Sequence, residues 1–100
     1  MSMTAATAGR ARLDQLWERG RAFLGTRYAI MGGAMTWVSE RNLVSAISNA
    51  GGFGVIACGS MDPGRLRDEI RATRALTGRP FGVNLIVMHP QLAELARTCV

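Results

Sequence analysis

The stretch YAIMGGAMTWVSERNLVSAISNAGGFGVIACG, residues 28–59, contains two short apolar runs, one on each side of a segment with helical periodicity. Glycines stand after the first run, at 32–33, and before the second, at 51–54. Glycine allows a chain to turn sharply or to approach another group closely. The pattern predicts a strand at 28–31, a helix at 40–49 that Ser39 caps, and a strand at 53–58.

The same alternation continues along the chain. Asp62 before Pro63 is typical of a helix N-terminus, because the N–H that proline lacks would have no partner in the helix there. That helix ends near 77–80, residues 81–88 form a third apolar strand, and another helical stripe follows Gln91. Upstream, the apolar spacing predicts an amphipathic helix over 13–24. Strands and helices that alternate with short connections predict an α/β fold of parallel β/α units.

Two architectures have this alternation of strands and helices, an open doubly wound sheet and a TIM (β/α)8 barrel. A barrel needs about 250 residues, whereas this chain has 100. Its last helical stripe also runs to Val100 without a cap or a following glycine. We therefore expect the N-terminal part of a longer protein, with an arm and helix at 1–27 and three β/α units at 28–100. Both architectures bind ligands at the carboxyl ends of the strands.

The composition narrows the classes of function. Hydrophobic residues make up 48% of the chain and charged residues 19%, as in globular proteins. All twelve basic residues are arginine, but the segment 65–74 mixes them with acids and lacks stacking aromatics, which favours a solvated helix face over nucleic-acid binding. Without a membrane-length apolar run or a secretory signal, we expect a cytoplasmic protein that does not enter a membrane.

The two cysteines, Cys58 and Cys99, lie in apolar surroundings and lack the spacing of metal ligands. This pattern predicts buried, reduced thiols and no metal site.

The run GFGVIA at 52–57 matches the letters of the dinucleotide fingerprint G-x-G-x-x-G/A. That fingerprint follows a strand and opens a helix, whereas this run follows a helix and becomes a strand. We therefore interpret its glycines as a structural turn between the helix and the sheet.

Two other places are candidates for contact with a ligand. The Gly-Gly-Ala run at 32–34 leaves the main chain bare after the first strand, beside the polarizable side chain of Met35. This run could face a flat ligand, or it could be a tight turn with Met35 in the core. Asn84 interrupts the third apolar strand, and its carboxamide needs either backbone partners or the edge of a ligand. Gly82 beside it would permit close approach.

Several motifs together carry a resemblance to a known family. They are GGAM followed by Trp37, SNAGGFGVI at 48–56, GSM at 59–61 and RPFGVNLIV at 79–87. In this order they resemble the nitronate monooxygenase family, formerly the 2-nitropropane dioxygenases, which is closely similar to the FMN-dependent enoyl-acyl-carrier-protein reductases. The resemblance covers about Tyr28 to Pro90.

The resemblance implies a TIM barrel that binds FMN at the strand ends and oxidises alkyl nitronates with O2 to a carbonyl compound and nitrite. The alternative is an FMN-dependent enoyl-acyl-carrier-protein reductase that uses NAD(P)H, because both families share these motifs. The family residues that contact the flavin correspond to five positions here, which are Gly32, Gly33, Ala34, Met35 and Asn84. Where the family commonly has Gln at 32, Gly or Pro at 34 and Pro at 29, this chain has small residues that preserve main-chain contacts.

The catalytic histidine of the family belongs to a glycine-rich segment further downstream, so the resemblance assigns no catalytic residue to this chain. His89 stands at a strand end, outside that motif, and we interpret it as a loop or helix-capping residue. The implied partners are an alkyl nitronate and O2, and a homodimer is compatible with the resemblance. A function of another class also stays open, namely an inactive barrel fragment or a binding module.

Overall fold

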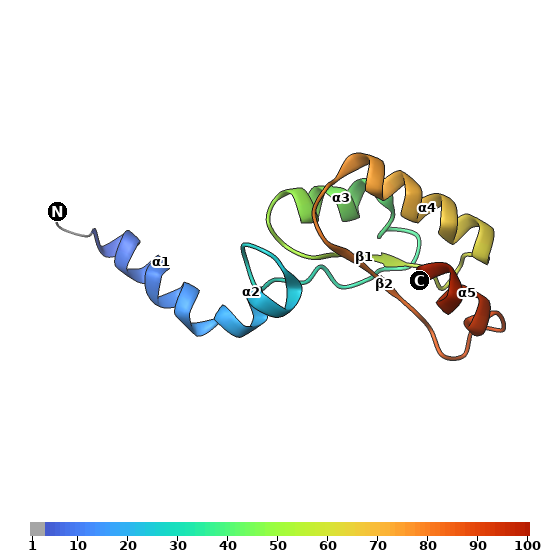
Figure 1. Ribbon diagram of the computed structural model, residues 1–100, viewed down its shortest axis with the longest axis horizontal. Coiled ribbons are helices and arrows are strands. Elements are labelled where there is room, and N and C mark those ends of the chain that lie inside the picture. The colour runs from blue at the N-terminus through green and yellow to red at the C-terminus, as the bar shows by residue number, and fades with distance from the viewer. Residues whose placement is uncertain (1–3) are drawn as a thin grey trace.

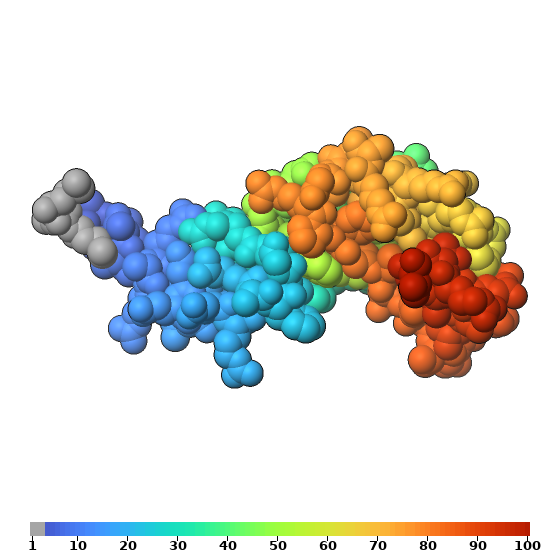
Figure 2. Space-filling view, viewed as in Figure 1, coloured from blue at the N-terminus to red at the C-terminus, as the bar shows by residue number. Residues whose placement is uncertain are grey.

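The computed structural model describes residues 4–100, so residues 1–3 of the predicted N-terminal arm lie outside the described part. The strands β1 and β2 form a parallel pair, and helices α3 and α4 lie on one side of it (Figure 1). Figure 2 shows α1 and α2, in blue, as an arm that extends away from the other helices and the strands. The molecule measures 57 × 25 × 22 Å along its principal axes. The elements are α1 (Ala5–Leu16), α2 (Glu18–Leu24), α3 (Arg41–Asn49), β1 (Gly54–Ala57), α4 (Pro63–Leu76), β2 (Phe81–Asn84) and α5 (Leu92–Cys99).

The strand predicted at 28–31 is reduced to one parallel bridge, between Met31 and Phe53. Phe53 N donates to Ile30 O at 2.8 Å, and Gly32 N donates to Phe53 O at 2.8 Å. The prediction was therefore right that this segment is parallel to its neighbour but wrong about its extent. The segment runs along the turn before β1 and forms no further ladder with β1 itself.

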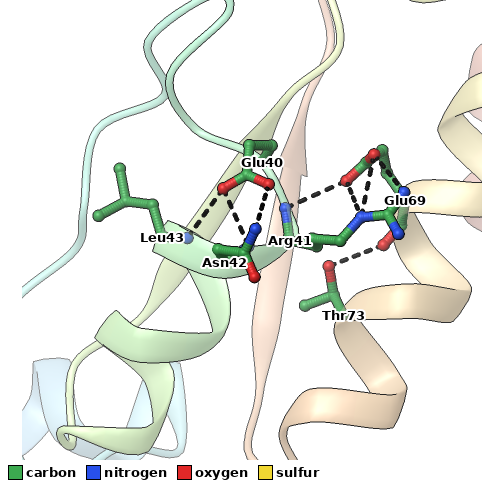
Figure 3. Close-up of polar contacts among 6 residues, drawn as sticks. All are labelled: Glu40, Arg41, Asn42, Leu43, Glu69 and Thr73. Atoms are coloured by element: carbon green, nitrogen blue, oxygen red, sulfur yellow. Dashed lines mark hydrogen bonds and ion pairs between the residues drawn. The ribbon is translucent and has the colours of Figure 1, made fainter.

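The helix predicted from Glu40 begins one residue later, and its cap is Glu40 rather than Ser39. Oε1 of Glu40 accepts from Asn42 N at 3.0 Å and from Leu43 N at 3.1 Å (Figure 3). Ser39 is buried, and its hydroxyl accepts from Met35 N at 2.8 Å instead. The choice of Ser39 as cap was wrong because the preceding turn already uses its oxygen.

A carboxylate from α4 holds the first residue of α3. Glu69 is 6% exposed, and it accepts from the backbone amide of Arg41 at 3.1 Å and from its guanidinium at 2.7 Å (Figure 3). The hydrogen bonds from Arg41 hold the pKa of Glu69 below its usual range, although burial acts in the opposite direction. Because a buried charge is costly unless it is paired, this contact fixes α3 and α4 relative to each other.

The core lies between the strand pair and helices α3 and α4, and α5 closes it with one side chain. Its buried apolar residues are Val44, Ile56, Cys58, Met61, Leu66, Ile70 and Leu95. A Cβ on Gly54 would overlap the carbonyl oxygen of Val44, so this glycine lets α3 approach the start of β1. Gly51 has a φ of 102° where α3 ends. These two glycines have the structural role that the sequence predicted for the run at 51–54.

The single helix predicted over 13–24 is wrong, because two helices, α1 and α2, meet at a break at Trp17. Neither contains a buried residue. Arg27 and Asp14 form an ion pair at 2.9 Å, and Trp17 meets the ring of Tyr28 edge-on at 6.1 Å between centroids. These side chains join the arm to the rest of the chain. No helix among residues 4–100 is long and apolar enough to cross a membrane.

The two cysteines differ in exposure. Cys58 is buried in the core, whereas Cys99 is exposed, so the prediction of two buried thiols was wrong for Cys99. Cys99 is the last residue of α5, one turn beyond Leu95, which closes the core. Burial raises the pKa of the Cys58 thiol.

Candidate functional site

Three loops meet at the carboxyl ends of β1 and β2. They follow the Met31 bridge, β1 and β2, and they span 32–40, 58–62 and 85–91. A Cβ on Gly59 would overlap Cδ1 of Ile86 and would lie 3.8 Å from Oγ1 of Thr36. One residue from each loop is therefore packed at the same point, on the edge where parallel β/α proteins bind ligands.

The turn at 32–35 is held on one side and open on the other. A Cβ on Gly32 would come within 2.6 Å of Cδ1 of Ile47, whereas a Cβ on Gly33 would meet no atom within 4 Å. Among the described residues, the amides of Gly33 and Ala34 have no hydrogen-bond acceptor. The side chain of Met35 is 51% exposed, so the alternative that places it in the core is excluded for this chain.

A hydrogen-bonded path joins this turn to Asn84. Met35 N donates to Ser39 Oγ at 2.8 Å, and Ala57 N donates to Ser39 O at 3.0 Å. Ala57 is the partner of Asn84 in the strand register. The structure thus places the turn and Asn84 at one edge, on opposite sides of β1. Asn84 is exposed there, and within residues 4–100 its carboxamide has no hydrogen-bond partner.

The third strand ends earlier than predicted. β2 stops at Asn84 rather than at residue 88, and His89 N donates to Ile86 O at 3.0 Å in the turn that follows. Gly82 makes room for an aromatic ring, because a Cβ there would lie 2.9 Å from Cε1 of Phe53. The close approach that we expected at Gly82 is therefore made by Phe53.

His89 connects two of the three loops. Its Nε2 donates to Met61 O at 3.0 Å, and its Nδ1 accepts from Gln91 N at 3.0 Å. Both bonds form together only in the neutral imidazole with its proton on Nε2. Gln91 is the N-cap residue of α5, and no side chain caps that helix. Of the two roles expected for His89, the structure therefore supports the loop role.

This edge offers open space and main-chain donors to a flat ligand that carries acceptors along one side, which is the kind of ligand that the family resemblance implies. The free amides of Gly33 and Ala34 can donate to such acceptors, and the carboxamide of Asn84 can both donate and accept. No side chain fills the space above Gly33. Within residues 4–100, no group of three His, Cys, Asp or Glu side chains could hold a metal ion.

Sequence reasoning named Trp37 only as part of a family motif and did not single out Arg65, and both residues lie at the same edge. The indole of Trp37 is 73% exposed, and its backbone has a φ of 70°. The guanidinium carbon of Arg65 lies 5.9 Å from the centroid of the indole ring. The signal in the sequence was the tryptophan itself, a large aromatic residue two positions after a glycine-rich turn.

Comparisons with known proteins show which family the chain is similar to by sequence. A family model described as nitronate monooxygenase matches residues 18–99. A nitronate monooxygenase from Paraburkholderia phytofirmans is 37% identical over 94 residues, which cover 94% of this chain and 24% of that protein. A (3aS,4S,5R,7aS)-5-hydroxy-7a-methyl-1-oxo-octahydro-1H-indene-4-carboxyl-CoA dehydrogenase from Mycobacterium tuberculosis is 39% identical over 62 residues, or 62% of this chain and 18% of that protein.

Among solved structures, FabK from Thermotoga maritima matches with a TM-score of 0.80 and 38% identity, over 82% of this chain and 26% of FabK. The chain therefore spans about a quarter or less of the length of these relatives. FabK is a TIM-barrel enzyme, and this mixed α/β chain matches part of it. The predicted fold class is therefore confirmed.

Proposed function

The chain belongs to the nitronate monooxygenase family, and from this premise we propose that the complete protein is an FMN-dependent enzyme that oxidises alkyl nitronates with O2. The products are a carbonyl compound and nitrite. In this proposal residues 28–100 are the first three β/α units of the barrel and supply one wall of the flavin site, and residues 1–27 precede the barrel as an arm. The observation that supports it most is the pair of free amides at Gly33 and Ala34, at the same edge as Asn84.

Each residue of this wall has a separate task in the proposal. The amides of Gly33 and Ala34 would donate hydrogen bonds to acceptors at the edge of the ring, and Asn84 would contact a further polar position from the other side of β1. Met35 would lie along the ring as a polarizable apolar contact. FMN, when bound, supplies the electron-transfer chemistry between the nitronate and O2, which side chains alone cannot provide.

His89 has a positioning task. Its bonds to Met61 O and Gln91 N keep the loops after β1 and β2 together at the site. The resemblance implies that the catalytic histidine of the family belongs to a segment further downstream, so this proposal gives His89 no catalytic role.

The second candidate is an FMN-dependent enoyl-acyl-carrier-protein reductase that uses NAD(P)H. The turn at 32–35 and Asn84 would serve that enzyme equally well, because they would contact the flavin and not the second substrate. The two reactions differ in their electron donor, and this difference allows a direct test.

The test uses the complete protein loaded with FMN, under anaerobic conditions. We expect the flavin absorbance to disappear when propane 2-nitronate is added. After O2 is admitted, the absorbance should return and nitrite should form. Loss of absorbance with NADH or NADPH alone would favour the reductase. If neither donor reduces the flavin, both candidates are wrong.

The 100-residue chain alone should be inactive, because the edge of β2 would have no neighbouring strand and the flavin phosphate would be unheld. Expression of this chain without yellow colour or flavin absorbance is the expected result. A stably folded, flavin-loaded chain of this length would contradict its assignment to part of a barrel.

A further inference from the structure

Trp37 has a conformation that the packing of this chain does not explain. Among the described residues it is the only non-glycine residue with a positive φ, 70°, and its side chain is 73% exposed. A bulky residue in the left-handed region is strained, and an exposed indole recovers little free energy by burial. Strain of this kind is found most often where a protein contacts a ligand. Trp37 is therefore a candidate for a role outside folding.

Arg65 faces the indole ring from the first turn of α4. Its guanidinium carbon lies 5.9 Å from the ring centroid, and its backbone amide donates to Oδ1 of Asp62 at 2.8 Å. The ion pairs within residues 4–100 are those of Arg27 and Arg41, so no carboxylate there lies within ion-pair distance of Arg65, although its charge acts on Glu69 one turn further along α4. A guanidinium over an aromatic face keeps its orientation while its N–H donors stay available at the edge.

The pair lies beside the proposed flavin face. Trp37 is two residues after Met35, inside a turn that is closed by Val38 N, which donates to Met35 O at 3.0 Å. Arg65 reaches the same edge from the helix that follows β1. Two apolar side chains beside the pair are exposed, Met35 at 51% and Val38 at 52%, and the exposed carboxylate of Asp62 caps the same turn of α4. The edge thus combines an arginine that forms no ion pair among residues 4–100 with two exposed apolar side chains.

We propose that Arg65 and Trp37 recognise the negative charge of the substrate and so select small anions with a short apolar body. This inference rests on the proposed function and adds residues that determine its specificity. A nitronate carries its charge on two coplanar oxygens, and the planar fork of a guanidinium can donate to both. The ring of Trp37 holds Arg65 in place, and the apolar side chains of Met35 and Val38 contact the alkyl part.

The first test measures binding without turnover. Isobutyrate has the charge and nearly the size of propane 2-nitronate, with a tetrahedral instead of a planar central carbon, and it does not react; isobutyramide is its neutral counterpart. The complete, FMN-loaded protein is titrated with each, and the change in flavin absorbance gives the dissociation constants. We expect a preference of about tenfold for isobutyrate, which Arg65→Gln abolishes and Arg65→Lys reduces in part. The matched control is Arg71→Gln, an exposed arginine on the same helix, which should keep the preference.

The second test concerns Trp37. Glycine adopts a positive φ without strain, so Trp37→Gly should leave the midpoint of thermal unfolding unchanged or higher and should weaken isobutyrate binding severalfold. An Arg65→Gln protein that retains the full preference for isobutyrate would overturn the inference, as would loss of the preference in Arg71→Gln. Nitronate oxidation by the wild-type protein is measured separately, so failure of the proposed function is distinguished from failure of this inference.

Discussion

Replacing Glu69 with glutamine should loosen the start of α3. The carboxylate is 6% exposed and accepts from the amide of Arg41 at 3.1 Å and from its Nη2 at 2.7 Å. It also lies at the N-terminus of α3, where a negative charge is favoured by the helix dipole. Glutamine keeps the length and one acceptor oxygen, so the substitution removes the charge and also replaces one of the two oxygens that accept from Arg41 with an NH2 donor.

The magnitude follows from these contacts. A hydrogen bond to a charged group contributes about 1.5–3 kcal/mol, and a charge at a helix terminus about 0.3–1 kcal/mol. The side chain of Arg41 is 42% exposed, so water screens part of the pair and the lower end applies. We expect Glu69→Gln to destabilise α3 by about 2 kcal/mol, which corresponds to about a 30-fold change in the opening equilibrium.

Amide hydrogen exchange of residues 41–49 in the complete protein, followed by mass spectrometry, measures this opening. The pKa of Glu69 is lowered in the folded state from its ordinary value of 4.5. The carboxylate therefore stabilises the fold above pH 4.5, and this stabilisation is lost as the pH falls through the folded pKa. The difference between wild type and Glu69→Gln should therefore shrink in acid. Asp68→Asn, an exposed neighbour on α4, is the control. Exchange that accelerates less than threefold at pH 7, or equally in both variants, would refute the reasoning.

Three further substitutions or reactions test other parts of the structure. Gly54→Ala should destabilise the protein by about 1–3 kcal/mol, because its Cβ would overlap the carbonyl of Val44; an unchanged urea midpoint would contradict this packing. His89→Ala should cost about 1 kcal/mol for each lost hydrogen bond while nitronate turnover stays within a few-fold, and a hundredfold loss of turnover at unchanged folding would assign His89 a chemical role instead. Cys58 should resist alkylation in the native protein and react only in denaturant, since burial raises the pKa of its thiol; rapid native labelling would show that the core opens.

Local signals predicted some elements well. Asp62 and Pro63 mark the start of α4 because their effects depend only on the first turn of that helix. Oδ1 of Asp62 does accept from Arg65 N in that turn. Ser39 misled because a serine hydroxyl can bond to the amides ahead of it or to a turn behind it. The surrounding residues decide between these two bonds, and here the amide of Met35 donates to the hydroxyl oxygen of Ser39. The extent of a strand likewise depends on its neighbours, which residue spacing does not reveal.

In the candidate site, too, some features could be predicted from the sequence and others could not. Gly33, Ala34 and Asn84 were identified by motifs, and the structure shows that they lie at one edge, although their contact with a flavin stays a prediction. The exposed ring and positive φ of Trp37 have no sequence signature, because the chemistry of tryptophan gives no reason to expect them. Its partner Arg65 belongs to a stretch of mixed charges that resembles an ordinary helix surface.

The most direct test of a flavin face at residues 32–35 is the dissociation constant for FMN of two matched glycine variants of the complete protein. A Cβ on Gly33 or on Gly78 would meet no atom of this chain within 4 Å, so Gly33→Val and Gly78→Val should both fold normally. Only Gly33 lies at the proposed site, whereas Gly78 lies in the loop between α4 and β2, at the opposite end of the strands. Fluorescence titration of the flavin-free protein should show FMN binding at least about tenfold weaker for Gly33→Val and unchanged for Gly78→Val. Equal affinities for the two variants and the wild type would contradict the flavin face at this turn.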